Sequence, residues 1–356
     1  MIAGDKEKRA TWAAIIENRM QFGIPYIIFR GNLNGNKPEV YKDKGYDIHA
    51  SNLCSEIALP SGPDESFVCC LSSMNALHYD EWKDTDAVET LTQFLDAVMQ
   101  EFIDKAEGTE FMERSVQFAK QHRAVGIGIL GWHSYLQSNM IPFETAEASM
   151  IGSEIAQTIK ERSYAESEKL ADRFGPAPVM EGRDDARRNT TTMAVAPTKS
   201  SSFILGQVSQ SVEPIKSNYF VVDRAKIKTT YRNPHLKRLL QEKGEDNEDT
   251  WEEIALKDGS VQHLDCLTDK EKRVFKTAAE ISQMAIVDQA AGRQKHIDQS
   301  QSINLFIDPK SVPAKDINKL YVEAWRKGVK SLYYQHGVNA AQDLSRDILD
   351  CEACEA

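Results

Sequence analysis

The 356-residue sequence lacks a long apolar run, and no segment approaches the roughly 20 residues that are needed to cross a bilayer. The charged stretch 1–9 also lacks the apolar core of a secretory signal. We therefore expect an intracellular, cytoplasmic protein without a membrane partner. In that compartment its few cysteines, at positions 54, 69, 70, 266, 351 and 354, should be mainly reduced or redox-active.

A surplus of basic residues is also missing. The chain has 43 Lys and Arg against 54 Asp and Glu, which gives a formal net charge of −11. This balance argues against a nucleic acid polymer as partner, because such binding relies on a basic footprint. A small phosphate ligand is not excluded, since backbone N–H groups at a helix N-terminus can bind one without net positive charge. Internal repeats and low-complexity tracts are absent as well.

What the chain does have is an unusual pentapeptide, Asn52-Leu53-Cys54-Ser55-Glu56. No helical apolar period runs through 50–66, so we expect an extended segment here, in which alternate side chains share one face. An amide, a thiol and a carboxylate would then converge on a small volume. This set suits chemistry at a hydroxyl-bearing carbon: the carboxylate takes the hydroxyl proton while sulfur acts on the neighbouring C–H. The alternative is a solvated strand edge with a chance cysteine.

A second extended run, 67–73, follows a Pro/Gly-rich turn at 60–63. A turn between two extended segments would return Cys69 or Cys70 to the side of Cys54. The sequence therefore predicts a second thiol near the first.

Hydrophobic periodicity predicts the remaining elements. Helices are expected at 5–20, 85–106, 144–173, 271–291 and 314–330, and strands at 25–29, 125–131, 190–196, 302–307 and 331–334. Residues 31–38 are predicted to be a connection and 241–250 a charged loop. Glycines within 125–131 suggest that another backbone approaches that strand closely. Strands that alternate with helices imply parallel βα units, in a barrel or an open sheet.

Two further motifs complete the pattern: Tyr333 and Tyr334 are adjacent, and the sequence finishes Cys351-Glu352-Ala353-Cys354. Together with the segment 52–56, they make the chain resemble the C-terminal half of the catalytic large subunit of class I ribonucleotide reductase, most closely the versions of large tailed bacterial viruses. The resemblance implies an α/β fold in which residues 1–336 form the second half of a ten-stranded α/β barrel and residues 337–356 a flexible redox tail.

The resemblance also implies catalytic roles. Cys54 would carry a transient thiyl radical that abstracts the 3′ hydrogen of the ribose. Glu56 would take the 3′-hydroxyl proton, and Asn52 would hydrogen-bond the substrate hydroxyls. Cys69 rather than Cys70 would supply reducing equivalents, because the family pattern Cys-x-Leu-[Ala/Ser]-Ser fits residues 69–73. Its disulfide partner belongs to the N-terminal half of the family.

The other motifs receive roles in the same way. Tyr333 and Tyr334 would relay oxidation from the small subunit, although adjacent tyrosines are also common in β-rich cores. Cys351 and Cys354 would restore the active-site thiols; as half of a zinc site they lack a second Cys or His pair. The last motif, a Ser/Thr-rich run, is expected to bind the substrate diphosphate, although such a run is also a frequent loop or helix cap. Its members are Pro197, Thr198, Lys199, Ser200 and Ser201.

The expected activity is the reduction of ribonucleoside diphosphates to deoxyribonucleoside diphosphates, in the cytoplasm of a bacterial host if the sequence is viral. The resemblance implies that this needs the N-terminal half, a small subunit with a dinuclear metal centre and tyrosyl radical, and thioredoxin or glutaredoxin. No metal or other cofactor is expected on this chain. A natural split and a truncation both remain open. The rival interpretations are a non-catalytic scaffold and a thiol–disulfide exchange protein.

Overall fold

The computed structural model describes residues 4–224, 227–308 and 312–337. The proposed tail, with Cys351 and Cys354, lies outside the described residues apart from Gly337, so its boundary and role stay predictions. Within the described ranges, no helix is long and apolar enough to traverse a lipid bilayer.

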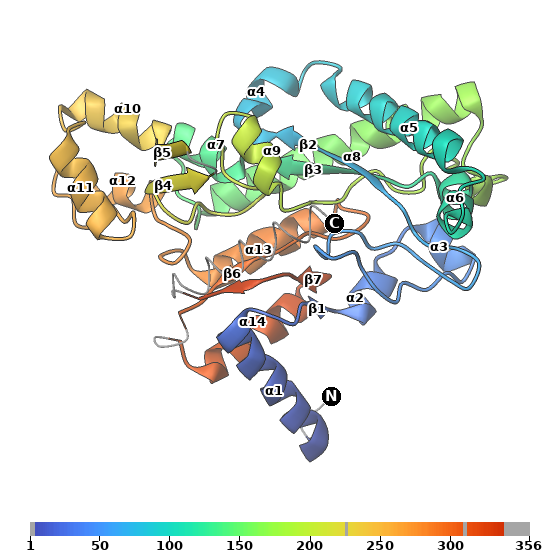
Figure 1. The fold of residues 1–356 in the computed structure, drawn as a ribbon, viewed down its shortest axis with the longest axis horizontal. Coiled ribbons are helices and arrows are strands. Elements are labelled where there is room, and N and C mark those ends of the chain that lie inside the picture. Colours follow the sequence, from blue (N-terminus) through green and yellow to red (C-terminus); the bar gives the residue numbers. More distant parts are fainter. Residues whose placement is uncertain (1–3, 225–226, 309–311, 338–356) are drawn as a thin grey trace.

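Figure 1 shows the elements coloured in chain order, beginning with α1 near the N-terminus. The α-helices are α1 Lys6–Phe22, α2 Arg30–Gly35, α3 Glu39–Asp43, α4 Tyr79–Trp82, α5 Ala87–Ala106, α6 Glu113–His122, α7 Trp132–Ser138, α8 Ala146–Phe174, α9 Lys199–Ile204, α10 Pro234–Lys243, α11 Glu248–Leu256, α12 Asp269–Val274, α13 Gln283–Gln294 and α14 Ala314–Arg326. The strands are β1 Ile27–Ile28, β2 Cys70–Asn75, β3 Val125–Leu130, β4 Tyr219–Arg224, β5 Ile227–Arg232, β6 Leu305–Phe306, β7 Ser331–Leu332 and β8 Gln335–His336.

The central sheet is a row of parallel extended segments. β2 pairs with β3, and single parallel bridges then join Ile127 to Met193 and Val195 to Gln301. The row continues where the Tyr333 amide donates to the Ile303 carbonyl over 2.8 Å and β6 pairs in parallel with β8. Five segments thus lie side by side, namely β2, β3, 191–195, 299–306 and 331–336, with β1 antiparallel to β7 at the end. This open half-barrel confirms the predicted fold class.

Helices pack on this sheet as the apolar periods predicted. α8 packs against α5 and α13, and α13 packs in turn against α14. Figure 1 shows the resulting order from α5 at the top, through β2 and β3, to α13 and α14, with α1 at the bottom. α8 begins where the Thr145 side chain accepts the Ala148 amide and ends at Gly175, whose φ of 85° few other residues adopt. The predicted helices at 5–20, 85–106, 144–173 and 314–330 are confirmed to within a few residues.

The predicted close approach at β3 is also confirmed. A Cβ atom built on Gly128 would lie 2.8 Å from the Ala194 carbonyl oxygen and 2.9 Å from the Ser73 Oγ. Both neighbours belong to adjacent segments of the sheet, and one of them is backbone, so neither can move away cheaply. Glycine at this position lets the segment 191–195 pack directly on β3.

Gly128→Ala is therefore expected to lower the free energy of unfolding by about 2 kcal/mol, the scale of overpacking in a filled core. Gly62→Ala is the matched control, because a Cβ at Gly62 meets nothing within 4 Å. The control should change stability by less than about 0.5 kcal/mol. Urea unfolding of both variants measures the difference, and equal midpoints would contradict the close-packing argument.

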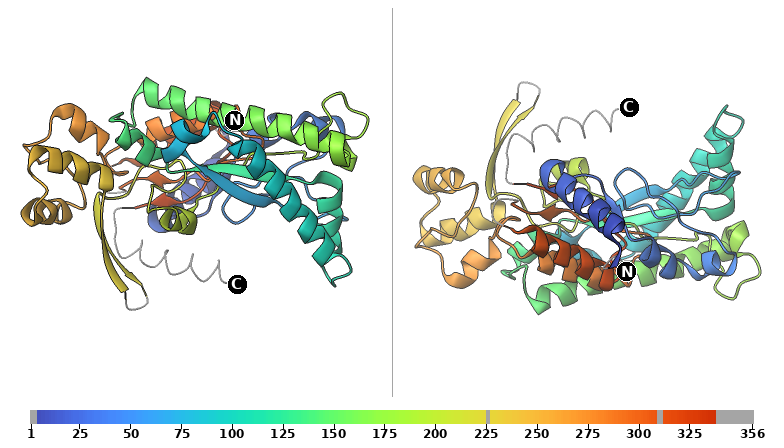
Figure 2. Two further views of the ribbon diagram at one scale, coloured as in Figure 1. Left: turned by 90° about the horizontal axis from the view of Figure 1, so that it is seen from above. Right: turned by 90° about the horizontal axis from the view of Figure 1, so that it is seen from below.

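A small lobe was not predicted. The segment 241–250 is not a loop: it contains the end of α10 and the start of α11, where the Asn247 side chain accepts the Thr250 amide as an N-cap. Trp251 and Leu240 are completely buried in the core of this lobe. Because the residues between Leu240 and Trp251 are mostly charged, the segment was interpreted as a loop, although it contains the ends of two short helices. The hairpin β4–β5 was also missed, and it projects from the same lobe in Figure 2.

Two other expectations were wrong in detail. Residues 30–35 form α2 instead of a connection, because Leu33 is buried and the Asn34 Oδ1 accepts the Ile48 amide. The helix predicted at 271–291 is interrupted between α12 and α13. There the Ala278 amide donates to the Ile215 carbonyl over 2.7 Å, a tertiary hydrogen bond that replaces the helical one.

Candidate active site

The backbone at 52–56 forms a turn, so the extended conformation predicted here was wrong. The Ser55 amide donates to the Asn52 carbonyl over 3.2 Å, and the Ile57 amide donates to the Asn52 Oδ1 over 3.0 Å. Ser55 adopts a φ of 68°. Asn52 thus closes the turn with its own side chain, a behaviour for which asparagine is well suited. Alternation along a strand is therefore not what places Asn52 beside Glu56.

The turn is held against the sheet segment 299–306 by backbone and side-chain contacts. The Ser300 amide donates to the Glu56 carbonyl over 2.9 Å. The Ser302 Oγ lies 2.5 Å from the Cys54 carbonyl oxygen and 3.1 Å from the Glu56 Oε2. Ser302 was not singled out from the sequence. It is 246 positions from Glu56 along the chain, and only the fold brings the two side chains together.

Glu56 is a buried carboxyl group, with a side chain only 2% exposed. Burial raises its pKa above the usual value, and hydrogen bonds from its own backbone, Asn52 and Ser302 partly oppose that rise. The Asn52 side chain therefore lies beside Glu56, as expected from the sequence, although a turn and not an extended segment places it there. A carboxylate with a raised pKa in a dry site is a suitable proton acceptor near neutral pH.

Cys69 lies close enough to Glu56 for the two groups to interact electrostatically. Its Sγ lies 3.4 Å from the Gln299 Nε2. Burial raises the pKa of the Cys69 thiol, the Gln299 hydrogen bond opposes that rise, and the charges of Cys70 and Glu56 add to it. Cys70 instead faces Arg123 and Asp96. The placement of Cys69 agrees with its selection over Cys70, while its redox role stays a prediction.

Tyr333 meets Cys54 directly. The Tyr333 hydroxyl lies 3.5 Å from the Cys54 Sγ, and the Tyr333 and Tyr334 ring centroids are 4.4 Å apart. Burial, and then the contact with Cys54, raise the pKa of Tyr333 far above its ordinary value. A phenolate is therefore disfavoured, and oxidation of this ring must release its proton together with the electron. Sequence reasoning missed Tyr26, whose ring lies 4.6 Å from Tyr333 and 4.9 Å from Tyr334.

The predicted phosphate-binding residues lie at the start of the short helix α9. Thr198 is its N-cap with a φ of 51°, and its Oγ1 accepts the Ser211 amide over 2.8 Å. The Lys199 Nζ lies 5.9 Å from the Tyr334 ring centroid, so this segment borders the tyrosine pair. Pro197 precedes the cap, and Ser200 and Ser201 belong to the first turn. The proximity of this segment to the tyrosine pair is established, whereas phosphate binding by the segment stays a prediction.

Glu213 is a further buried carboxyl group beside this region. The Asn304 Nδ2 donates to its Oε1 over 2.7 Å, and the Asn304 Oδ1 accepts the Tyr334 amide over 3.0 Å. Burial raises the pKa of Glu213 to about 7, against the opposing charges of Lys216 and Lys199. No motif marked Glu213 in the sequence, since its partner Asn304 is 91 positions away.

The raised pKa of Glu213 predicts a pH-dependent stability. Between the ordinary pKa of 4.5 and about 7, the folded state holds a proton that the unfolded state has lost. The free energy of unfolding should therefore fall as pH rises through this window. Glu213→Gln should remove that fall and stabilise the chain above neutral pH by up to roughly 3 kcal/mol. Urea unfolding at about pH 5 and pH 8 measures it, with the exposed Glu252→Gln as charge-matched control. Equal pH slopes in all three chains would contradict the assignment.

Comparisons with known proteins agree with this geometry. A family model described as the ribonucleotide reductase barrel domain matches residues 5–187 and 181–335. The ribonucleoside-diphosphate reductase large subunit of Invertebrate iridescent virus 3 is 41% identical over 327 residues, 91% of this chain and 51% of that protein. The large subunit of Danio rerio is 29% identical over 91% of this chain and 44% of its own length.

A solved structure gives the same result in three dimensions. The class Id ribonucleotide reductase alpha subunit of Actinobacillus ureae superposes with a TM-score of 0.90 and is 54% identical. The match covers 96% of this chain and 63% of that subunit. The present chain thus spans between 44% and 63% of the length of these three proteins. On this evidence the chain belongs to the ribonucleotide reductase large-subunit family, and its described residues form part of the barrel domain of that family.

Proposed function

We propose that this chain carries the substrate-reducing site of a class I ribonucleoside-diphosphate reductase, which converts ribonucleoside diphosphates to deoxyribonucleoside diphosphates. The observation that carries the proposal is the contact of 3.5 Å between the Tyr333 hydroxyl and the Cys54 Sγ. A hydrogen atom can pass directly from a thiol to an oxidised tyrosine over such a contact. Few structural roles require a buried tyrosine, a second tyrosine in ring contact with it and a cysteine at its hydroxyl.

In the proposed reaction, oxidised Tyr333 takes the hydrogen of the Cys54 thiol and leaves a sulfur radical. That radical abstracts the 3′ hydrogen of the ribose. Glu56 accepts the 3′-hydroxyl proton, and its raised pKa supports this role because it makes the carboxylate a stronger base. Asn52 orients the hydroxyls, and Cys69 supplies reducing equivalents together with a cysteine from another chain segment.

The diphosphate would be bound by Pro197, Thr198, Lys199, Ser200 and Ser201. Backbone N–H groups at the start of α9, the serine hydroxyls and one ammonium group are the donors that phosphate oxygens need. The position of Lys199 beside the Tyr334 ring supports the proposal, because it places this segment next to the radical-bearing residues.

The proposal extends to partners. The N-terminal part of the large subunit would complete the half-barrel and supply the second redox cysteine. A small subunit with a dinuclear metal centre and tyrosyl radical would supply the one-electron oxidant through Tyr334. Cys351 and Cys354 would pass electrons from thioredoxin or glutaredoxin. The proposed location is the cytoplasm, of a bacterial host if the chain is viral.

Reconstitution tests this function. The chain is mixed with an N-terminal partner and a radical-bearing small subunit, and cytidine diphosphate reduction is followed with a dithiol present. We expect activity only when all three components are present. Reduction of disulfides by the chain alone, without nucleotide turnover in the mixture, would favour a thiol–disulfide exchange protein instead. A stable but inactive assembly would favour a scaffold.

Glu56→Gln should lower nucleotide reduction in this mixture by about a hundredfold, the scale of losing a general base. The active form of Glu56 is the carboxylate, so parental activity should rise with pH through a pKa above the ordinary 4.5. The variant should lack that acidic limb. Asp64→Asn, an exposed change in the following loop, is the control and should retain the parental profile. An unchanged profile in Glu56→Gln would rule out this base.

A further inference from the structure

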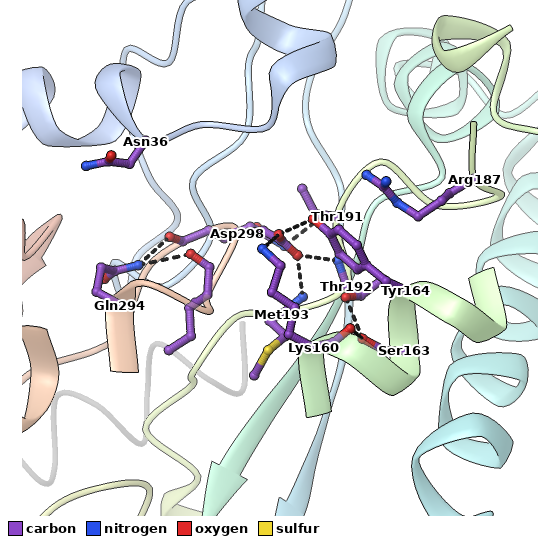
Figure 3. A network of polar contacts seen from close by, with 12 residues as sticks. Asn36, Lys160, Ser163, Tyr164, Arg187, Thr191, Thr192, Met193, Gln294 and Asp298 are labelled. Carbon is purple, nitrogen blue, oxygen red and sulfur yellow. Dashed lines mark hydrogen bonds and ion pairs between the residues drawn. The ribbon is translucent and has the colours of Figure 1, made fainter. Parts of the chain in front are cut away.

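Gln299 occupies a fixed position at the start of the central sheet segment 299–306. Its amide donates to the Met193 carbonyl over 3.2 Å, and its carbonyl accepts the Gln294 Nε2 over 3.1 Å. The preceding residue, Asp298, is anchored as well: its Oδ2 accepts the Thr192 and Met193 amides over 2.8 and 3.1 Å. Figure 3 shows this network around Asp298. The backbone of Gln299 therefore has little freedom, and its side chain has a defined direction.

The far side of Asp298 is held just as firmly. Its Oδ1 accepts the Tyr164 hydroxyl and pairs with the Lys160 ammonium group at 3.2 Å, both from α8. In Figure 3 these side chains converge on Asp298 from the helix. The segment that carries Gln299 is thus tied to the adjacent sheet segment on one side and to a long helix on the other.

The side chain of Gln299 is completely buried and makes contacts at both ends. Its Oε1 accepts the Ala58 amide over 3.3 Å, directly after the turn that carries Cys54 and Glu56. Its Nε2 lies 3.1 Å from the Thr191 Oγ1 and 3.4 Å from the Cys69 Sγ. One amide group therefore joins the segment of the proposed radical cysteine to the proposed reducing cysteine.

The two N–H groups of this amide have three acceptors within reach, because the Val125 carbonyl lies 3.2 Å from Nε2. The Thr191 hydroxyl already donates to the Val125 carbonyl over 3.1 Å. The Val125 carbonyl oxygen has two lone pairs and accepts from both groups, so the Gln299 amide shares its two N–H groups among the Val125 oxygen, the Thr191 oxygen and the Cys69 sulfur.

We propose that Gln299 is a positioning residue for both redox cysteines: its amide nitrogen orients Cys69 and stabilises the thiolate form, and its amide oxygen holds the segment that follows Cys54. The inference rests on the proposed function for the meaning of the two cysteines, but the contacts and their effect on sulfur belong to this chain alone. A thiolate is a stronger hydrogen-bond acceptor than a thiol, so the N–H group favours the reactive form.

The hydrogen bond from Gln299 is important because the other surroundings of Cys69 disfavour its thiolate form. Burial disfavours the thiolate, and so do the negative charge of Glu56 and the neighbouring thiol of Cys70. Tyr41, which is also buried, interacts electrostatically with Cys69 but is neutral at ordinary pH, since burial raises its pKa. Among the described groups that shift the Cys69 pKa, Gln299 is the one that lowers it.

Two variants separate the two ends of the amide. Gln299→Leu removes both the donor and the acceptor. Gln299→Glu keeps an oxygen for the Ala58 amide and replaces the nitrogen that faces Cys69. Both are measured on the full chain by itself: alkylation of each cysteine by iodoacetamide across pH, resolved by peptide mass spectrometry, and hydrogen exchange of the Ala58 amide.

In Gln299→Leu, Cys69 should react about tenfold more slowly near pH 8, the scale of losing one hydrogen bond to a charged group. Its Ala58 amide should also exchange faster. Gln299→Glu should slow Cys69 at least as much while Ala58 stays protected. Cys70 is the internal control, because it faces Arg123 and Asp96 instead of Gln299. Its alkylation profile should not move in either variant.

Unchanged Cys69 profiles in both variants would overturn the inference, as would equal shifts of Cys69 and Cys70. If Gln299→Leu fails to fold, Gln299→Glu still decides the effect on sulfur because it has nearly the same shape. The outcome is separable from the proposed function: an inactive reconstituted mixture would refute the reductase, whereas these readouts need neither nucleotide nor partner.

Discussion

A chain with serine in place of Cys54 is expected to lose nucleotide reduction by about ten-thousandfold in the reconstituted mixture, the scale reached when the reacting group itself is removed. Serine keeps the size of the side chain and can still bond to the Tyr333 hydroxyl, which lies 3.5 Å from the Cys54 Sγ. Its O–H bond is too strong to give up a hydrogen atom to an oxidised tyrosine. Chemistry should therefore fail while folding and assembly persist.

Cys266→Ser is the matched control for this experiment. Cys266 packs against the separate core of the α10–α12 lobe, away from the Cys54 turn, and its replacement should leave turnover close to the parental value. Assembly is followed by size-exclusion chromatography and turnover by deoxycytidine diphosphate formation. Full activity of Cys54→Ser would remove the radical role and leave the scaffold as the better interpretation.

Tyr333→Phe should have the next largest effect, a loss of about a thousandfold in the rate constant with little change in substrate affinity. Phenylalanine preserves the ring contacts of 4.4 Å with Tyr334 and 4.6 Å with Tyr26. It removes the hydroxyl that lies 3.5 Å from the Cys54 Sγ, and a phenyl ring has no O–H hydrogen to exchange. Direct transfer of the Cys54 hydrogen atom to residue 333 would then be lost.

The corresponding control is Tyr231→Phe. Tyr231 stacks on Phe220 in the projecting hairpin, so its hydroxyl can be removed without touching the site. Steady-state kinetics of both variants give the rate constant and the KM separately. If Tyr333→Phe turned over normally, the hydrogen atom of Cys54 would have to leave by another route, and the roles of both tyrosines would be withdrawn.

The sequence predicted those parts of the fold that depend on local periodicity. Val88, Leu95 and Met99 repeat at helical spacing and are buried on α5. The apolar run of β3 is buried throughout, and its glycines do mark a close backbone approach. Where charge or a tertiary hydrogen bond decides the backbone, as at 241–250 and 275–282, periodicity gave the wrong answer.

The sequence predicted which residues belong to the candidate site better than it predicted how they are arranged. Asn52 and Glu56 do interact, but through a turn that the Asn52 side chain closes instead of through strand alternation, and the Cys54 Sγ contacts Tyr333. Ser302 and Gln299 complete the site and could not be found, because each is linked to its partners only by the parallel sheet. Ordinary side chains acquire such roles from distant neighbours.

The long sequence separations within the site also have a kinetic consequence. Glu56 meets Ser302 across 246 positions, and Cys54 meets Tyr333 across 279. Contacts of this span incur their loop-closure entropy before they contribute stability, so folds of high contact order form slowly. The contact of the Cys54 thiol with Tyr333 should consequently form only in the later steps of folding. Until those steps, the Cys54 thiol of a nascent chain would be open to oxidation.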